Sequence, residues 1–149
     1  MPPDSPDVLD PGTAWQERHP PEASPLWHWA PTGLTDLPGI RRDLRHRLAE
    51  HRSDDGRGVA DPDMFVLAVD ELMSNALRHG RAPVEVDIGR AGDAWLLTVC
   101  DRAVEAPPRP EIDRDPVHGG MGLGLVAHAG VREGWYASDA GKHVWVLLP

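Results

Sequence analysis

The chain has 149 residues, a formal net charge of −9 and a single cysteine. A chain of this size can enclose one hydrophobic core but not two. The negative charge argues against nucleic acid or an anionic membrane as the main partner, although it permits a basic protein surface. No apolar run approaches the roughly 20 residues that cross a bilayer, and the first residues do not resemble a secretion signal. We therefore expect a cytoplasmic domain without an internal disulfide.

The first 25 residues form a compositionally distinct tail. They hold seven of the sixteen prolines and few aliphatic residues. Such a stretch buries too little apolar surface to offset the entropy of ordering it, which predicts a disordered or loosely docked tail over residues 1–25. The folded domain is expected over residues 26–149. Trp15 is the exception in the tail, because it could anchor this segment on the domain itself or on a partner.

Helix and strand patterns alternate in the first half of the expected domain. Trp27 and Trp29 alternate with other residues, as in a short half-buried strand. Apolar residues then recur at helical spacing over residues 37–48, and the arginines between them are expected to form a solvated face. Residues 61–63, Asp-Pro-Asp, predict the start of a second helix, and Gly80 is well placed to end it.

The second half of the chain predicts two hairpins separated by a proline-rich loop. Alternating apolar residues indicate strands, and glycine with aspartate marks the turns. The expected elements are strands at 84–88 and 95–100, a long loop at 102–118, a helix at 122–129, and strands at 135–138 and 143–148.

The second helix carries an acid and an amide that could bind a metal ion or accept a proton. Residues 71–80 read Glu-Leu-Met-Ser-Asn-Ala-Leu-Arg-His-Gly, so Glu71 and Asn75 are spaced i and i+4 and share one helix face. An asparagine carbonyl oxygen is a suitable ligand for Mg²⁺, which takes its other ligands from water and phosphates. A carboxylate one turn earlier could orient or deprotonate an attacking hydroxyl. Taken alone, the pair is better explained as an ordinary surface glutamate and helix asparagine.

A glycine-rich loop follows later in the chain. Residues 119–125 read Gly-Gly-Met-Gly-Leu-Gly-Leu and run into an expected helix. Glycines let backbone amides approach an anion closely, and a helix N-terminus favours negative charge. The loop lacks the Gly-Lys-Ser/Thr of a Walker motif and the strand–helix setting of a dinucleotide fingerprint. Phosphate binding and a flexible hinge both remain open from this loop alone.

Asp101 stands at the end of the strand expected at 95–100. A carboxylate half buried among apolar neighbours needs a hydrogen-bond donor to compensate its desolvation. An adenine amino group would supply one, whereas a plain turn-starting aspartate is the alternative.

The order of these features resembles the ATP-binding domain shared by histidine kinases and gyrase, the Bergerat fold of the GHKL superfamily. The series comprises an acid–Asn helix, a strand ending in Asp, a proline-rich loop, a glycine loop entering a helix, and Gly-Lys before a final strand. Within that superfamily the chain is most similar to the small anti-sigma factors that act as serine/threonine kinases. The resemblance implies an α/β fold of the α+β two-layer type, in which a mixed β-sheet carries helices on one face.

The resemblance also implies roles for particular residues. Glu71 would be the general base, Asn75 the Mg²⁺ ligand and Asp101 the acceptor of the adenine amino group. Residues 102–118 would form a lid over ATP. Gly141 and Lys142 would begin the last adenine-side strand. The phosphate contacts would come from the glycine loop, through Gly120, Gly122, Leu123 and Gly124.

Three positions depart from the family pattern on the base-recognition side. Ala103 and Glu105 replace the glycines that usually follow the adenine-binding aspartate. Glu105 brings a negative charge toward a site for a polyanion, and Ala103 requires a negative φ there. His143 replaces a threonine that helps to bind adenine, and its imidazole would replace that hydrogen bond, stack near the base or obstruct it.

The resemblance implies an anti-sigma regulatory kinase that binds ATP and Mg²⁺, sequesters a sigma factor and phosphorylates a serine on a small antagonist protein. A homodimer is the oligomeric state that it suggests. The alternative hypothesis is a binding module with a weakened nucleotide site, which regulates by sequestering its partner alone. A detached histidine kinase domain ranks lower, because no helix pair with a marked phosphoacceptor histidine is apparent.

Overall fold

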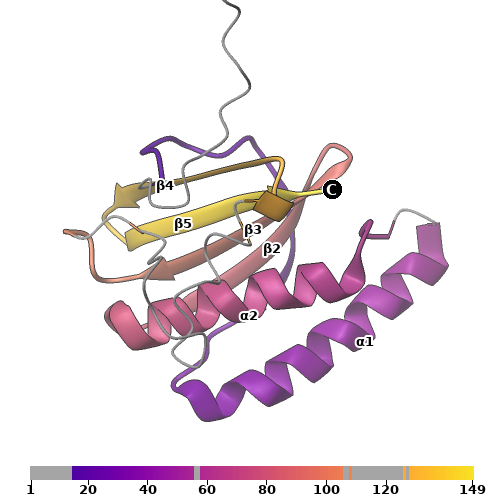
Figure 1. Ribbon diagram of the computed structural model, residues 1–149, viewed down its shortest axis with the longest axis horizontal. Helices are drawn as coiled ribbons and strands as arrows, with labels where there is room; N and C mark the ends of the chain where they lie inside the picture. The colour runs from indigo at the N-terminus through magenta and orange to yellow at the C-terminus, as the bar shows by residue number, and fades with distance from the viewer. Residues whose placement is uncertain (1–14, 56–57, 106–107, 109–125, 127) are drawn as a thin grey trace, which may run out of the picture.

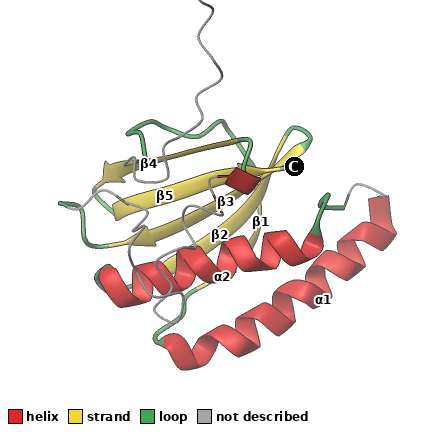
Figure 2. Ribbon diagram, viewed as in Figure 1, coloured by secondary structure: helices red, strands yellow, loops and turns green. Residues whose placement is uncertain are grey.

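The computed structural model describes residues 15–55, 58–105, 108, 126 and 128–149. Two helices lie together on one face of a five-stranded sheet, so that the molecule has a helical and a strand layer (Figures 1 and 2). The expected two-layer α+β fold is therefore confirmed. The elements are β1 (Ser24–Trp29), η1 (Leu34–Asp36), α1 (Leu37–Asp55), α2 (Pro62–His79), β2 (Glu85–Ala91), β3 (Ala94–Asp101), β4 (Arg132–Ser138) and β5 (Gly141–Leu148).

The sheet has the strand order β1-β2-β3-β5-β4, and each neighbouring pair is antiparallel. Two-residue turns join β2 to β3 and β4 to β5, and such short connections suit antiparallel neighbours, whereas parallel neighbours need a long crossover. The expected sheet was mixed. Within the described residues the parallel component is a single bridge, between Glu17 and Trp135 at the β4 edge.

Helix α2 begins and ends as its sequence predicts. The Asp61 side chain caps its N-terminus by accepting a hydrogen bond from the Met64 N–H at 3.1 Å, and Pro62 occupies the first turn. The Gly80 N–H donates to the Ala76 carbonyl at 2.9 Å and closes the C-terminus. Neither α1 nor α2 combines the length and apolar character that crossing a bilayer would demand.

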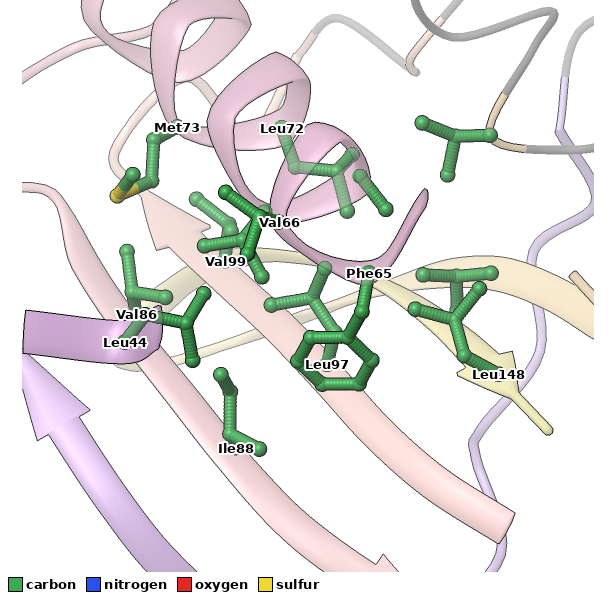
Figure 3. Packing of buried hydrophobic residues seen from close by; sticks show 14 of the residues in the cluster. Leu44, Phe65, Val66, Leu72, Met73, Val86, Ile88, Leu97, Val99 and Leu148 are labelled. Atoms are coloured by element: carbon green, nitrogen blue, oxygen red, sulfur yellow. The ribbon is translucent and has the colours of Figure 1, made fainter. Parts of the chain in front are cut away.

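The main core lies between the helices and the sheet (Figure 3). In a strand, alternate side chains point to opposite faces, and every second residue of β2, β3 and β5 enters this core. Met73 and Leu72 of α2 and Leu44 of α1 meet them from the helical layer. The core residues of the strands are Val86, Ile88, Trp95, Leu97, Val99, Val144, Val146 and Leu148.

The opposite, helix-free face of the sheet carries a second, smaller cluster. Leu96, Trp145 and Leu147 are buried there. Arg18 covers Trp145, because its guanidinium carbon lies 5.9 Å from the indole centroid and its carbonyl accepts a hydrogen bond from the Trp145 Nε1–H at 2.9 Å. Because side chains alternate along β3 and β5, half of them face the helices and the other half lie on the helix-free face of the sheet.

An N-terminal strap, residues 15–23, lies against the sheet before β1 begins. Figure 1 shows this indigo segment beside β4. The Trp135 N–H donates to the Gln16 carbonyl at 3.0 Å, and the Arg18 N–H donates to the Trp135 carbonyl at 2.8 Å. Trp15 is 5% exposed and belongs to the main core cluster.

These contacts correct the expected tail boundary. The tail was expected to end at residue 25, but β1 begins at Ser24, and residues 15–23 are held by hydrogen bonds to β4 and β5. Trp15 is the physical reason, because one large buried side chain supplies the apolar surface that the proline-rich composition lacks. Of the two anchors considered for Trp15, the structure therefore supports this domain. Residues 1–14 lie outside the described residues.

Replacement of Trp15 with alanine is expected to lower the free energy of unfolding by about 3–5 kcal/mol, because it empties a core position filled by the largest side chain. Urea denaturation measures this change. Val131→Ala is the control, since Val131 is 69% exposed and its truncation should cost within about 0.5 kcal/mol. Equal stability of the two variants would mean that the strap is not docked in solution.

Candidate functional site

Helix α2 presents Glu71 and Asn75 on one face, as predicted from their i, i+4 spacing. Both side chains are half-buried, whereas their neighbours Leu72, Met73 and Ala76 enter the core. The Ser74 hydroxyl donates to the Glu71 carbonyl at 3.2 Å, which ties this buried serine to the helix backbone. Because the core residues hold one side of α2, the acid and the amide keep fixed positions on its other side.

The environment of Glu71 favours a basic carboxylate. Burial raises the pKa of Glu71 above its ordinary value, and the neighbouring negative charge of Asp70 raises it further. The positive charge of Arg78 acts in the opposite direction and lowers this pKa. A carboxylate with a raised pKa accepts a proton more readily than an exposed glutamate does, as a general base requires.

The second part of the site is the carboxylate of Asp101 at the end of β3. Asp101 is 2% exposed, and its Oδ1 accepts a hydrogen bond from the Ala103 N–H at 2.6 Å. A Cβ atom built on Gly80 would lie only 2.6 Å from the Asp101 carboxylate, so the end of α2 packs directly on this group. The glycine that caps α2 is thus also the residue that leaves room for Asp101.

Strand β5 adds a cation to this carboxylate. Lys142 is the register partner of Asp101, and its Nζ lies 3.6 Å from Asp101 Oδ2. Gly141 precedes it with a φ of +136°, and a Cβ there would collide with the Asp101 carbonyl oxygen. Only glycine therefore lets β5 approach β3 closely enough at this end. The resemblance assigned Lys142 a place in the adenine-side strand, but no sequence pattern indicated its ion pair with Asp101.

Two of the three departures from the family pattern are accommodated. Ala103 is buried, and a positive φ occurs only at glycines among the described residues, so this alanine meets the condition of a negative φ. Glu105 forms an ion pair with Arg81, the residue that follows Gly80. The Arg102 N–H also donates to the Arg81 carbonyl at 2.9 Å. The added negative charge of Glu105 is consequently offset by a neighbouring cation.

The structure does not bring His143 to the same side of the sheet as the Asp101 carboxylate. Its Nε2 lies 2.8 Å from the Ser138 hydroxyl oxygen, and its ring stacks on Tyr136 with centroids 4.4 Å apart. Adjacent residues of a strand point to opposite faces, so His143 joins Trp145 on the helix-free face while Lys142 faces α2. The residue beside Asp101 is therefore Lys142, one position earlier than the sequence analysis expected.

The expected phosphate-binding residues Gly120, Gly122, Leu123 and Gly124 lie outside the described residues, as does most of the expected lid at 102–118. The expected helix at 122–129 is helical at its described positions 126, 128 and 129.

The residues present fit a magnesium nucleotide. Asn75 offers a neutral oxygen and Glu71 a carboxylate, the oxygen donors that Mg²⁺ prefers when phosphates complete its coordination. Gly80, five residues after Asn75, lies roughly 7.5 Å further along the helix axis and contacts Asp101. A carboxylate has about four acceptor sites, so the bond from Ala103 leaves Asp101 able to accept another donor. One side of α2 therefore carries groups that are able to hold a metal and accept a proton, and its end lies against a carboxylate that is able to accept a hydrogen bond from a base.

A comparison with known protein families identifies the domain type. A family model described as histidine kinase-like ATPase domain matches residues 34–147, which is more than half of the chain. The match includes α1, α2, β2, β3 and β4 and nearly all of β5. No curated protein matches the chain.

Proposed function

The chain belongs to the family of histidine kinase-like ATPase domains, and from this we propose that it is a regulatory protein kinase that transfers phosphate from ATP to a serine or threonine. The observation that carries the proposal is the pair on α2, a half-buried Glu71 with a raised pKa one turn before Asn75. This combination supplies a proton acceptor next to a metal ligand, as phosphoryl transfer to a hydroxyl needs.

In this mechanism each residue has one task. When bound, ATP would supply the phosphoryl group and leave as ADP, and its magnesium ion would neutralise the charge of the phosphates. Glu71 accepts the proton of the attacking serine hydroxyl, and Asn75 holds the metal so that the acceptor and the phosphate stay aligned. Asp101 binds the base at the end of α2. Glu71, Asn75 and Asp101 thus follow one another along this helix.

The proposed partners are a sigma factor, which the protein would sequester, and a small antagonist protein, which would carry the acceptor serine. The proposal is tested by incubating radiolabelled ATP with a cell extract and the protein. We expect labelled phosphoserine in a small protein when the wild type is added, and none with Asn75→Ala. Labelling that persists with the variant would contradict the role of Asn75, and no labelling in either case would contradict the kinase.

The second candidate is a module that acts by sequestration alone. It is favoured by the engagement of Asp101 with Lys142 and Ala103, which surrounds the base-binding group with partners from its own chain. Under this function, Glu71→Ala would leave partner binding and regulation unchanged, whereas under the first function it would abolish control through phosphorylation.

The pH dependence of the transfer rate is expected to reflect the ionisation of the Glu71 carboxyl. Glu71 acts in its ionised form, so the rate falls as the pH drops through its raised pKa, at a higher pH than for an ordinary glutamate. Asp70→Asn removes the like charge, lowers the pKa of Glu71 and moves this acidic limb to lower pH. Arg78→Ala removes the opposite charge and moves it to higher pH. A profile of kcat/KM against pH for the three proteins checks this, and shifts in the same direction would contradict the assignment.

A further inference from the structure

The Asp101 carboxylate is enclosed by its own chain. Asp101 is 2% exposed. Its Oδ1 accepts a hydrogen bond from the Ala103 N–H at 2.6 Å, and Lys142 Nζ lies 3.6 Å from its Oδ2. A Cβ atom on Gly80 would stand only 2.6 Å from Oδ2, so this glycine lies directly against the carboxylate. A base that is to reach Asp101 must therefore displace one of these three neighbours.

Ala103 is the neighbour that can move with the least disruption. Lys142 lies within β5, and Gly80 is the C-terminal cap of α2, so both are held by regular structure. Ala103, in contrast, lies in the 102–105 turn, which directly follows β3. Segments outside helices and strands open at a lower free-energy cost than the core elements of a domain do. Opening of this turn would uncover Asp101 without disturbing α2 or the sheet.

Two side chains hold the turn in its closed position. Glu105 forms an ion pair with Arg81, the residue that follows the cap of α2. On the other side, Arg102 Nη1 donates to the Asp139 carbonyl at 3.1 Å, between β4 and β5. The ion pair is open to solvent, because its side chains are 64% and 57% exposed, so it can break without unfolding the domain. A glycine at position 105, as in the family pattern, would be unable to form this contact.

We propose that the ion pair between Arg81 and Glu105 is a latch, which holds the 102–105 turn closed over Asp101 and limits the access of the base. The inference rests on the proposed function, in which Asp101 binds the base. A nucleotide that binds only the open form has its apparent affinity reduced by the fraction of the protein that is closed. Breaking the ion pair is therefore expected to strengthen ATP binding rather than weaken it.

The latch is distinguishable from a direct effect of charge on a polyanion. Glu105→Gln removes a negative charge and Arg81→Gln removes a positive one, so direct electrostatics would shift the affinity for ATP in opposite directions. The latch predicts the same direction for both variants, a gain of about two- to fivefold, the range for an exposed ion pair. The charge swap that combines Arg81→Glu with Glu105→Arg restores the pair and should return the affinity to that of the wild type.

Calorimetric titration with MgATP measures these affinities. The ion pair between Arg45 and Asp63 supplies the control, because it is also exposed but joins α1 to the first turn of α2, at the other end of that helix from Gly80. Arg45→Gln and Asp63→Asn should leave the affinity unchanged. Opposite shifts in the two latch variants, or no shift in either, would overturn the latch while leaving ATP binding intact. Failure of all these proteins to bind ATP would instead overturn the proposed function and, with it, the role of the latch in base access.

A second readout needs no nucleotide. The Ala103 N–H is bonded to Asp101 when the turn is closed, so its hydrogen exchange, followed by NMR, reports the opening of the turn. We expect this exchange to be about two- to fivefold faster in Arg81→Gln and Glu105→Gln than in the wild type. Arg45→Gln should leave it unchanged. Equal exchange in the wild type and the two latch variants would mean that the ion pair does not hold the turn, which would overturn the inference.

Discussion

Replacement of Glu71 with glutamine is expected to lower the rate of phosphoryl transfer by about 10²–10⁴-fold, the contribution of a positioned general base. Glutamine has nearly the same shape but does not accept the proton of the attacking hydroxyl. ATP affinity should change little, because Asn75, the proposed metal ligand, and the carboxylate of Asp101 remain. The measurement is a single-turnover transfer assay together with calorimetric binding of ATP.

Glu133→Gln is the matched control for this substitution. Glu133 is also a largely buried carboxyl whose pKa burial raises, but it lies on β4 rather than on α2. Its replacement should leave transfer within about twofold of the wild type if only Glu71 touches the reacting hydroxyl. Transfer by Glu71→Gln at the rate of the control would contradict the role of Glu71 as the base.

Replacement of Gly141 with alanine is expected to lower the free energy of unfolding by at least about 3 kcal/mol. Its φ of +136° lies in a region that only glycine adopts readily, and the new Cβ would collide with the Asp101 carbonyl oxygen. A loss of this size is a large part of the roughly 5–15 kcal/mol that stabilise a domain. Urea denaturation measures it.

Gly92→Ala separates the two causes of this loss. Gly92 has a φ of +62°, but no atom lies within 4 Å of where its Cβ would stand. Its replacement should cost only the backbone strain, about 1–2 kcal/mol. A similar loss for both variants would mean that the collision with the Asp101 carbonyl oxygen adds nothing to the cost of the strained φ.

Local patterns were enough to predict most of the fold. Asp61, Pro62 and Gly80 mark the ends of α2 because capping depends on residues adjacent in sequence. The hairpins likewise follow from short turns and alternation along the strands. The docking of Trp15 could not be predicted, because it depends on contacts with β4 more than a hundred residues away.

The candidate site, like the fold, could be predicted only where it depends on residues close in sequence. Glu71 and Asn75 share a helix face, which follows from their spacing alone. Asp101 and Lys142 meet only because β3 pairs with β5 in one particular register, and the sequence does not state that register. The same register puts His143 on the helix-free face, because one residue along a strand reverses the direction of the side chain.

The central claim is that this chain binds ATP through a magnesium ion held by Asn75. Calorimetric titration with ATP and ADP, with and without Mg²⁺, tests it most directly when Asn75→Ala is measured alongside. Asn75 is half-buried, so circular dichroism should show the variant folded as the wild type is. We predict binding that requires Mg²⁺ and is lost in the variant. No binding at millimolar nucleotide, or equal binding by the two proteins, would contradict it.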